Sequence, residues 1–162
     1  MNHLWSPWRM SYVQSLKDEE GCVFCSLLAL PDGPQNLIVH RGRRNFAILN
    51  RFPYTSGHMM IVPFEHHSTL CELDSDTRSE MMEMTTKSIE VLGSEYHPQG
   101  FNVGINIGEA AGAGITEHIH MHIVPRWSGD TNFMSSLGNT RVMPETLEDS
   151  YLRIKKVWEG ET

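Results

Sequence analysis

The stretch that most constrains this chain is Glu117–Arg126, with the sequence EHIHMHIVPR. Three histidines, His118, His120 and His122, alternate in it with apolar residues. Because side chains alternate between the two faces of a strand, the pattern predicts a strand with all three imidazoles on one face. Buried imidazole nitrogens need polar partners, so three of them on one face indicate a site that uses them. A metal-binding face or a cluster of hydrogen-bonded core histidines is the alternative explanation.

Length and composition favour one folded domain over residues 1–162. The chain is 40% hydrophobic and 20% charged, as expected for a globular protein with a core. Its net charge of −7 argues against nucleic-acid binding, so an anionic ligand would be held locally by imidazoles and backbone N–H groups. The sequence has no run for a membrane helix, no signal-peptide core and only three cysteines, so we expect a cytoplasmic protein without membrane contact.

Hydrophobic patterning predicts an α+β fold: an antiparallel sheet of about five strands, one long helix and a C-terminal helix. Beside the histidine strand, strands are expected at 37–40, 46–50, 58–63 and 100–107, and helices at 73–92 and 144–158. We divide the chain into an aromatic N-terminal extension (1–21), a core (22–126) and a C-terminal extension (127–162). The exposed aromatic residues of the first segment would suit a homodimer.

The long helix carries its own start and stop signals. Asp74 or Asp76 can cap its beginning, and Gly93 is expected to end it. An apolar inner face is expected from the spacing of Met81, Met84, Ser88, Ile89 and Leu92. Cys71, just before the helix, is expected to be a buried small hydrophobe.

The residues around the histidines suit chemistry on a phosphate. Neutral imidazole attacks phosphorus and also carries protons, so His120 could be a nucleophile while a neighbouring histidine assists the leaving group. The loop Gly108–Gly114, GEAAGAG, precedes the histidines and offers unhindered backbone N–H groups to phosphate oxygens. Gly104, inside the preceding strand, marks a place where another group could approach the backbone.

Cys22 and Cys25 form a C-x₂-C pair, a frequent half of a tetrahedral zinc site. Taken alone, the pair is ambiguous, because two buried thiols or a redox pair would have the same spacing. The spacing therefore leaves the metal question open.

The chain resembles the histidine triad (HIT) proteins, whose signature is His-φ-His-φ-His-φ-φ with φ apolar. HIHMHIV matches it at every position, and FAILNRFPYTSGHMMIVPFEH resembles the hairpin and following strand of the family. The likeness covers roughly residues 22–126. It implies a HIT-like fold and a nucleotidyl hydrolase or transferase that works through a covalent nucleotidyl-histidine.

The resemblance also implies roles for individual residues. His120 would attack the α-phosphorus, His122 would contact the phosphate and help the leaving group, and His58 would support the imidazoles. The implied contacts to ribose and phosphate come from Asn50, Asn106, His122 and the backbone of Gly112, Gly114 and Ile115. The sequence departs from the family at GAGITEH, where many relatives carry Gly-Gln-Ser or Gly-Gln-Thr, although Thr116 could substitute.

The resemblance further implies a structural zinc on Cys22, Cys25, His66 and His118, with His67 as a competitor for His66. The segments LWSPWRMSYV, CVFC and HIVPRW look like the diadenosine tetraphosphate phosphorylase branch of the family. A purine nucleotide or dinucleoside polyphosphate is therefore the expected ligand, cleaved with phosphate or water as the second nucleophile. The alternatives are a nucleoside phosphoramidate hydrolase, acting on aminoacyl- or lysyl-AMP, and a nucleotide-binding module without turnover. A pure zinc hydrolase is disfavoured, because no acidic general base is evident beside the histidines.

Overall fold

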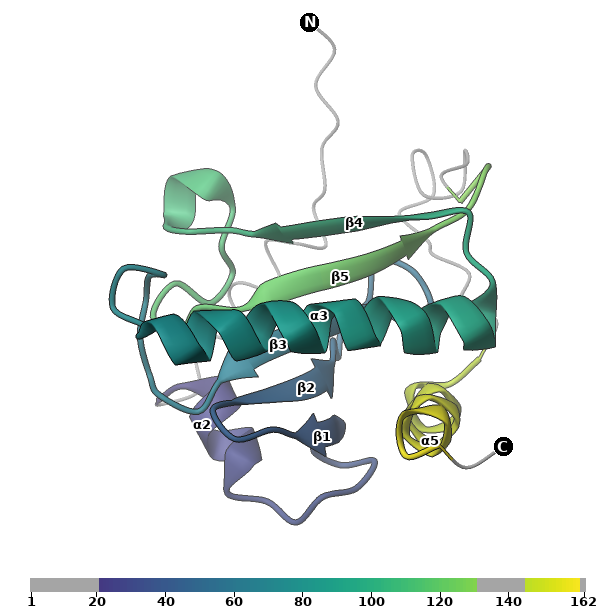
Figure 1. Cartoon of the computed structure of the whole chain (residues 1–162), viewed down its shortest axis with the longest axis horizontal. Coiled ribbons are helices and arrows are strands. Elements are labelled where there is room, and N and C mark those ends of the chain that lie inside the picture. The colour runs from purple at the N-terminus through teal and green to yellow at the C-terminus, as the bar shows by residue number, and fades with distance from the viewer. Residues whose placement is uncertain (1–20, 131–144, 161–162) are drawn as a thin grey trace, which may run out of the picture.

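A computed structural model describes residues 21–130 and 145–160 of the chain. Its centre is an antiparallel five-stranded sheet with the strand order β1-β2-β3-β5-β4. The strands are β1 (Ile38–Arg41), β2 (Asn45–Leu49), β3 (Met59–Pro63), β4 (Gly100–Ile105) and β5 (Met121–Arg126). The helices are α2 (Val23–Leu28), α3 (Ser75–Tyr96) and α5 (Leu147–Trp158), with a short 3-10 turn, η1, at Glu109–Ala111. The predicted α+β class with five strands is confirmed (Figure 1).

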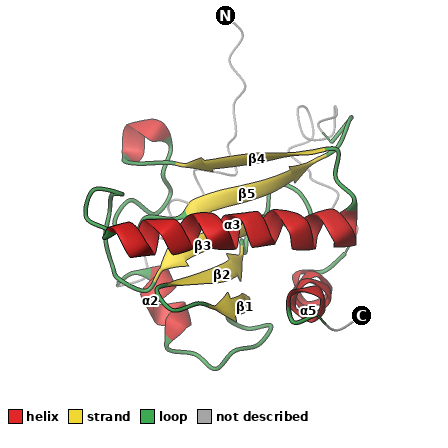
Figure 2. Ribbon diagram, in the orientation of Figure 1, coloured by secondary structure: helices red, strands yellow, loops and turns green. Residues whose placement is uncertain are grey.

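Helix α3 lies across one face of the sheet, over β2, β3 and β5, and α5 lies beside it near β1 (Figures 1 and 2). Every residue of β2 and β3 is buried, because these two strands are central and covered. Phe46 of β2 meets Phe24 of α2 with their ring centroids 6.5 Å apart. Asn45, its neighbour on the opposite face, donates from its amide to the Thr77 carbonyl of α3. The sheet is therefore packed between α3 and the short helix α2.

The long helix differs from its predicted bounds at its C-terminal end. Asp74 caps the helix by accepting the Thr77 N–H, as expected for one of the two candidate caps. The end at Gly93 was wrong: the helix runs on to Tyr96 and stops at His97, which adopts a left-handed conformation with φ +47°. Glycine in a helix interior costs only about 1 kcal/mol, which packing of the neighbouring Val91 and Leu92 outweighs. The buried residues of α3 include Met81, Met84, Ser88 and Leu92 of the predicted inner face.

One helix was not predicted, and two other local predictions need correction. Helix α2 begins directly after Cys22 and includes Cys25, and its six residues are too few for a periodic signal. The C-terminal helix begins at Leu147 rather than residue 144, because Thr146 is its N-cap and accepts the Asp149 N–H. Cys71 is exposed rather than buried, since it lies in the turn that leads to α3. The predicted aromatic N-terminal segment lies mostly outside the described residues.

In the described part of the chain, strand β4 forms one edge of the sheet and pairs only with β5. Helix α3 does not cover it, so Val103 is 44% exposed and nearby Ile107 is 43% exposed. A Cβ added at Gly104 would meet no described atom within 4 Å, so the space there is open, and an approach by another group stays a prediction. Within the described part of the chain, no helix is both long and apolar enough to cross a membrane.

Candidate active site and metal-binding cluster

The sequence pattern predicted one continuous strand for the histidine segment, and that prediction is wrong. Strand β5 begins only at Met121, so His122 lies on it while His118 and His120 precede it. The Ile119 N–H is donated to the His67 carbonyl at 2.7 Å, outside the β3–β5 pairing. His118 and His120 therefore lie outside the strand pairing, but the imidazoles stay close together. Phe24 contacts the rings of both His118 and His120, and the His120 ring lies 4.8 Å from the His122 ring.

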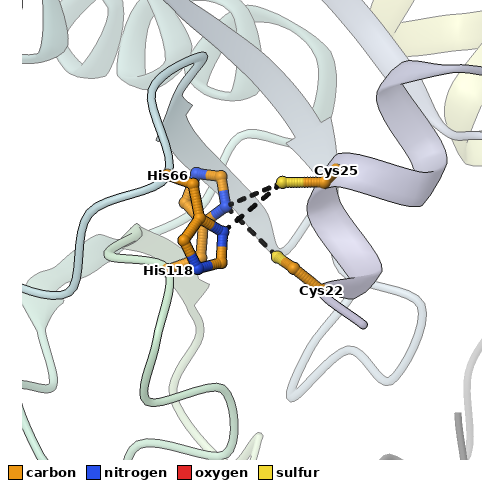
Figure 3. Close-up of side chains that lie close together, drawn as sticks. All are labelled: Cys22, Cys25, His66 and His118. Atoms are coloured by element: carbon orange, nitrogen blue, oxygen red, sulfur yellow. Dashed lines mark hydrogen bonds between the residues drawn. The ribbon is translucent and has the colours of Figure 1, made fainter. Parts of the chain in front are cut away.

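His118 faces the N-terminal helix α2 and joins the two cysteines there (Figure 3). Its Nδ1 lies 3.2 Å from Sγ of Cys22 and 3.7 Å from Sγ of Cys25. His66 Nδ1 lies 3.4 Å from Sγ of Cys25. The ligand atoms of all four residues lie within 4.8 Å of one another, so they form a cluster that could hold a metal ion. His67 is not part of it and instead places Nε2 3.5 Å from a Glu65 carboxylate oxygen.

The protonation states in this cluster suit a cation. His118 donates from Nε2 to the Pro63 carbonyl at 2.9 Å, which leaves the lone pair of Nδ1 toward the thiols. Burial lowers the pKa of His118 to about 4, so the ring is neutral, as a ligand must be. Burial raises the pKa of Cys22 to about 11, which favours the protonated thiol. Coordination to a divalent ion reverses this preference, because the ion binds the thiolate.

Whereas His118 bonds a backbone carbonyl through Nε2, His120 does so through Nδ1. Its Nδ1 lies 2.9 Å from the carbonyl oxygen of His118, and because a carbonyl only accepts, Nδ1 carries the proton. The lone pair of His120 is therefore on Nε2, the nitrogen that can attack an electrophile. Burial lowers the pKa of His120, more than the bond to His118 raises it, so the ring is neutral. A neutral imidazole with a fixed tautomer is a competent nucleophile.

His122 belongs to a second chain of hydrogen bonds. The Tyr54 N–H is donated to Nδ1 of His58 at 3.2 Å, so a neutral His58 carries its proton on Nε2. That nitrogen lies 3.0 Å from Nδ1 of His122, which accepts the bond and keeps its own proton on Nε2. The rings of His120 and His122 are 4.8 Å apart between centroids. A nucleophilic nitrogen and a proton-donating nitrogen thus come from adjacent rings.

Phe24 was not identified from the sequence as a site residue. It lies between the two cysteines of α2, is 2% exposed, and packs against both His118 and His120. Its ring centroid is 5.4 Å from that of His118 and 5.1 Å from that of His120. Its place inside the C-x₂-C pair is the only sequence signal that could have drawn attention to it.

The other predicted contact residues surround these rings. Asn50 is 9% exposed at the end of β2, with its side-chain oxygen accepting the Phe52 N–H. Asn106 is half-buried directly after β4. The Gly112 N–H is already used within η1, where it is donated to the Glu109 carbonyl. Among the described residues, no hydrogen bond uses the N–H groups of Gly114 or Ile115, which leaves that part of the loop for a ligand.

Fold and site together define a nucleotide hydrolase or transferase of the histidine triad class. The HIT domain model matches residues 33–129, more than half of the chain, and the chain belongs to this family. The predicted family and enzyme class are thereby confirmed.

One relative in sequence and two solved structures are similar to this chain. The AP-4-A phosphorylase of Mycobacterium tuberculosis is 37% identical, with the match covering 98% of this chain and 85% of that protein. A zinc-bound histidine triad family protein from Mycobacterium smegmatis has a TM-score of 0.69 at 26% identity, covering 86% of this chain and 94% of that one. A histidine triad nucleotide-binding protein from Sulfolobus tokodaii has the same TM-score at 27% identity, covering 86% of this chain and 93% of its own.

Proposed function

We propose that the protein cleaves dinucleoside polyphosphates of the diadenosine tetraphosphate type through a nucleotidyl-His120 intermediate. The observation that carries the proposal is the tautomer of His120, whose Nδ1 is bound to the His118 carbonyl and whose Nε2 holds the lone pair. The 37% identity to an AP-4-A phosphorylase over nearly the whole chain supports the choice of substrate.

In the first step, Nε2 of His120 attacks the α-phosphorus and forms a P–N bond. The bond from phosphorus to the bridging oxygen breaks, and Nε2 of His122 supplies a proton to that oxygen. His58 holds Nδ1 of His122 as an acceptor, which keeps the transferable proton on Nε2. The N–H groups of Gly114 and Ile115 would bind non-bridging oxygens, with Gly112 shaping the turn, and Asn50 and Asn106 would contact the ribose.

In the second step, inorganic phosphate or water attacks the same phosphorus and the P–N bond to His120 breaks. The proton of the attacking group returns to Nε2 of His122, which restores the starting state. With phosphate as acceptor, diadenosine tetraphosphate yields ATP and ADP. With water, it yields ATP and AMP.

The cluster of Cys22, Cys25, His66 and His118 would hold a structural zinc ion. A tetrahedral site with Zn–S of about 2.3 Å and Zn–N of about 2.0 Å separates sulfur from nitrogen by about 3.5 Å. The three S···N distances of 3.2, 3.4 and 3.7 Å fit that value. Four protein ligands close the site, so the ion would fix α2 to the histidine segment and take no part in the chemistry. The zinc-bound relative from Mycobacterium smegmatis supports this assignment.

A homodimer would use the exposed edge of the sheet. Among residues 21–130 and 145–160, no second strand pairs with the outer row of β4 backbone groups, and Val103 and Ile107 add apolar surface there. An edge of this kind is a template for pairing with a second copy of the chain.

Product analysis tests the proposed reaction. Purified protein is incubated with diadenosine tetraphosphate, with and without inorganic phosphate, and the products are separated by chromatography. We expect ATP plus ADP only when phosphate is present, and no turnover by His120→Ala. Cleavage of an AMP-amide in preference to this substrate would select the phosphoramidate hydrolase. Nucleotide binding without any product would select the binding module.

A further inference from the structure

The loop between β2 and β3, residues 50–58, is held in one conformation by its own hydrogen bonds. The Asn50 N–H is donated to the His58 carbonyl at 2.9 Å, and the His58 N–H to the Thr55 carbonyl at 3.2 Å. Gly57 has φ +73° and approaches α3 so closely that an added Cβ would lie 2.9 Å from a Leu92 methyl group. The loop therefore closes tightly against the body of the domain.

A side-chain bond also ties this loop to the strand that carries His122. The Thr55 hydroxyl is donated to the Pro125 carbonyl of β5 at 2.8 Å. Strands β3 and β5 pair no further than Met59 with Ile123, so the hydroxyl continues the contact beyond the ladder. Thr55 thus fixes the separation between the start of β3, where His58 lies, and the strand of His122.

Tyr54 acts on the two histidines from the same loop. Its backbone N–H holds Nδ1 of His58 as an acceptor. Its ring centroid is 4.8 Å from that of His58 and 6.3 Å from that of His122, at interplanar angles of 33° and 26°. One residue therefore sets the His58 tautomer and packs over the bond between the two imidazoles.

We propose that Tyr54 and Thr55 are positioning residues that keep His122 ready as the proton donor to the leaving group. They act through His58. The Tyr54 backbone N–H keeps the His58 proton on Nε2, and the Tyr54 ring, which is the part that a substitution removes, packs over both imidazoles. The Thr55 hydroxyl keeps Nε2 of His58 within reach of His122. This inference rests on the proposed function, because it concerns the proton that the leaving oxygen receives. Loosening either residue removes acid assistance while leaving the nucleophile His120 in place.

Two substrates that differ only in their leaving group test the proposal. The p-nitrophenyl ester of AMP expels a stable anion that needs no proton, whereas the phenyl ester expels a more basic oxygen and depends on acid assistance. We measure kcat and KM on both esters for Thr55→Val, Thr55→Ser, Tyr54→Leu and Tyr54→Phe. Thr86→Val is the matched control, because it removes a hydroxyl-to-carbonyl bond from an exposed threonine of α3.

General acid catalysis contributes about 10²- to 10⁴-fold, so partial loss of alignment should cost about tenfold in kcat. We expect Thr55→Val and Tyr54→Leu to lose about tenfold more on the phenyl ester than on the p-nitrophenyl ester. Thr55→Ser and Tyr54→Phe should restore the wild-type ratio, and Thr86→Val should keep it. Equal losses on both esters would overturn the proposal, since they would indicate general damage. A wild type that forms no nucleotidyl-His120 on either ester would instead refute the proposed function.

Long-range ¹H–¹⁵N spectra of the imidazoles give a second measurement that needs no variant. In the wild type, both His58 and His122 should show an unprotonated Nδ1 and a protonated Nε2. Thr55→Val should mix the two tautomers of His122. A wild-type His58 with its proton on Nδ1 would overturn the proposal whatever the kinetics.

Discussion

Nε2 of His58, the residue directly before β3, lies 3.0 Å from Nδ1 of His122 on β5, although the two residues are 64 positions apart in the chain. His58 is 1% exposed, so a water molecule cannot readily take its place as the hydrogen-bond donor to His122. The contact decides which nitrogen of His122 is a donor, and that decision is what the proposed chemistry requires.

Replacing His58 by Phe should therefore lower kcat about 10- to 100-fold and leave KM nearly unchanged, because the contact assists the transition state rather than binding. The measurement is steady-state turnover of diadenosine tetraphosphate with saturating phosphate. His97→Asn, at the exposed end of α3, serves as the control and should behave as the wild type. A His58→Phe protein that changes only KM would contradict the assigned role.

Removal of the proposed zinc ion should disturb both the stability of the fold and the nucleophile. Cys22→Ser deletes one ligand, and we expect it to lose zinc and roughly 3–5 kcal/mol of unfolding free energy. The His118 carbonyl holds His120, and Phe24 packs on both rings, so activity should fall with the metal content. Metal analysis, denaturant unfolding and turnover are measured together. Cys71→Ser is the control, because Cys71 is exposed and outside the cluster. Full zinc content in Cys22→Ser would contradict the assignment.

The sequence was a good guide to the elements and to the metal cluster. Alternation and apolar runs located four of the five strands to within one or two residues, whereas the histidine strand begins four residues later than predicted. The central strands β2 and β3 were the easiest to locate, because strands buried on both faces are continuous in their hydrophobicity. The cluster was predictable only through the family resemblance, since nothing in the spacing of Cys25 and His66 tells which distant histidine joins a C-x₂-C pair. The division of the chain into extensions and core stays a prediction.

The sequence could not show where the histidine strand begins or which tautomer each histidine adopts, because single backbone hydrogen bonds decide both. The alternation of His118, His120 and His122 predicts one continuous strand, but β5 begins only at Met121, and the Ile119 N–H bonds to the His67 carbonyl outside the strand pairing. Tertiary contact overrides local pattern here. The tautomers of His120 and His58 are likewise set by a backbone carbonyl and a backbone N–H. Every residue has a carbonyl and nearly every residue an N–H, so the sequence alone does not reveal these tautomers.

Glu80 of α3 is a stability device that a pH titration can expose. Its carboxylate accepts the N–H groups of Arg43, Arg44 and Asn45 at 2.6–2.9 Å, which holds the turn between β1 and β2. Burial raises the pKa of Glu80, but these bonds and the Asn45 amide outweigh burial and hold the pKa below its ordinary value. The stabilisation is therefore complete above the ordinary pKa and is lost as pH falls through the lower folded value.

Glu80→Gln should cost roughly 2 kcal/mol of unfolding free energy at pH 7, because a neutral amide cannot accept all these donors. The difference in unfolding free energy between Glu80→Gln and the wild type should shrink as the pH falls below 4.5, the ordinary pKa of Glu80. It shrinks because the wild-type carboxyl becomes protonated and then also accepts fewer hydrogen bonds. Urea unfolding across the pH range measures it, with the exposed Glu83→Gln on the same helix as control. A difference that stays constant down to low pH would show that charge is not the cause.

The exposed edge of β4 gives a test of the proposed homodimer. Val103→Lys places a charge on this edge and should convert the dimer to a monomer, since like charges would face each other across the two-fold axis. Leu152→Lys is the matched control, because Leu152 of α5 is 54% exposed and lies away from β4. Light scattering at matched concentration measures the mass of each variant. A wild-type monomer would refute the proposed homodimer. A dimer that survives Val103→Lys and is lost in Leu152→Lys would place the interface away from β4.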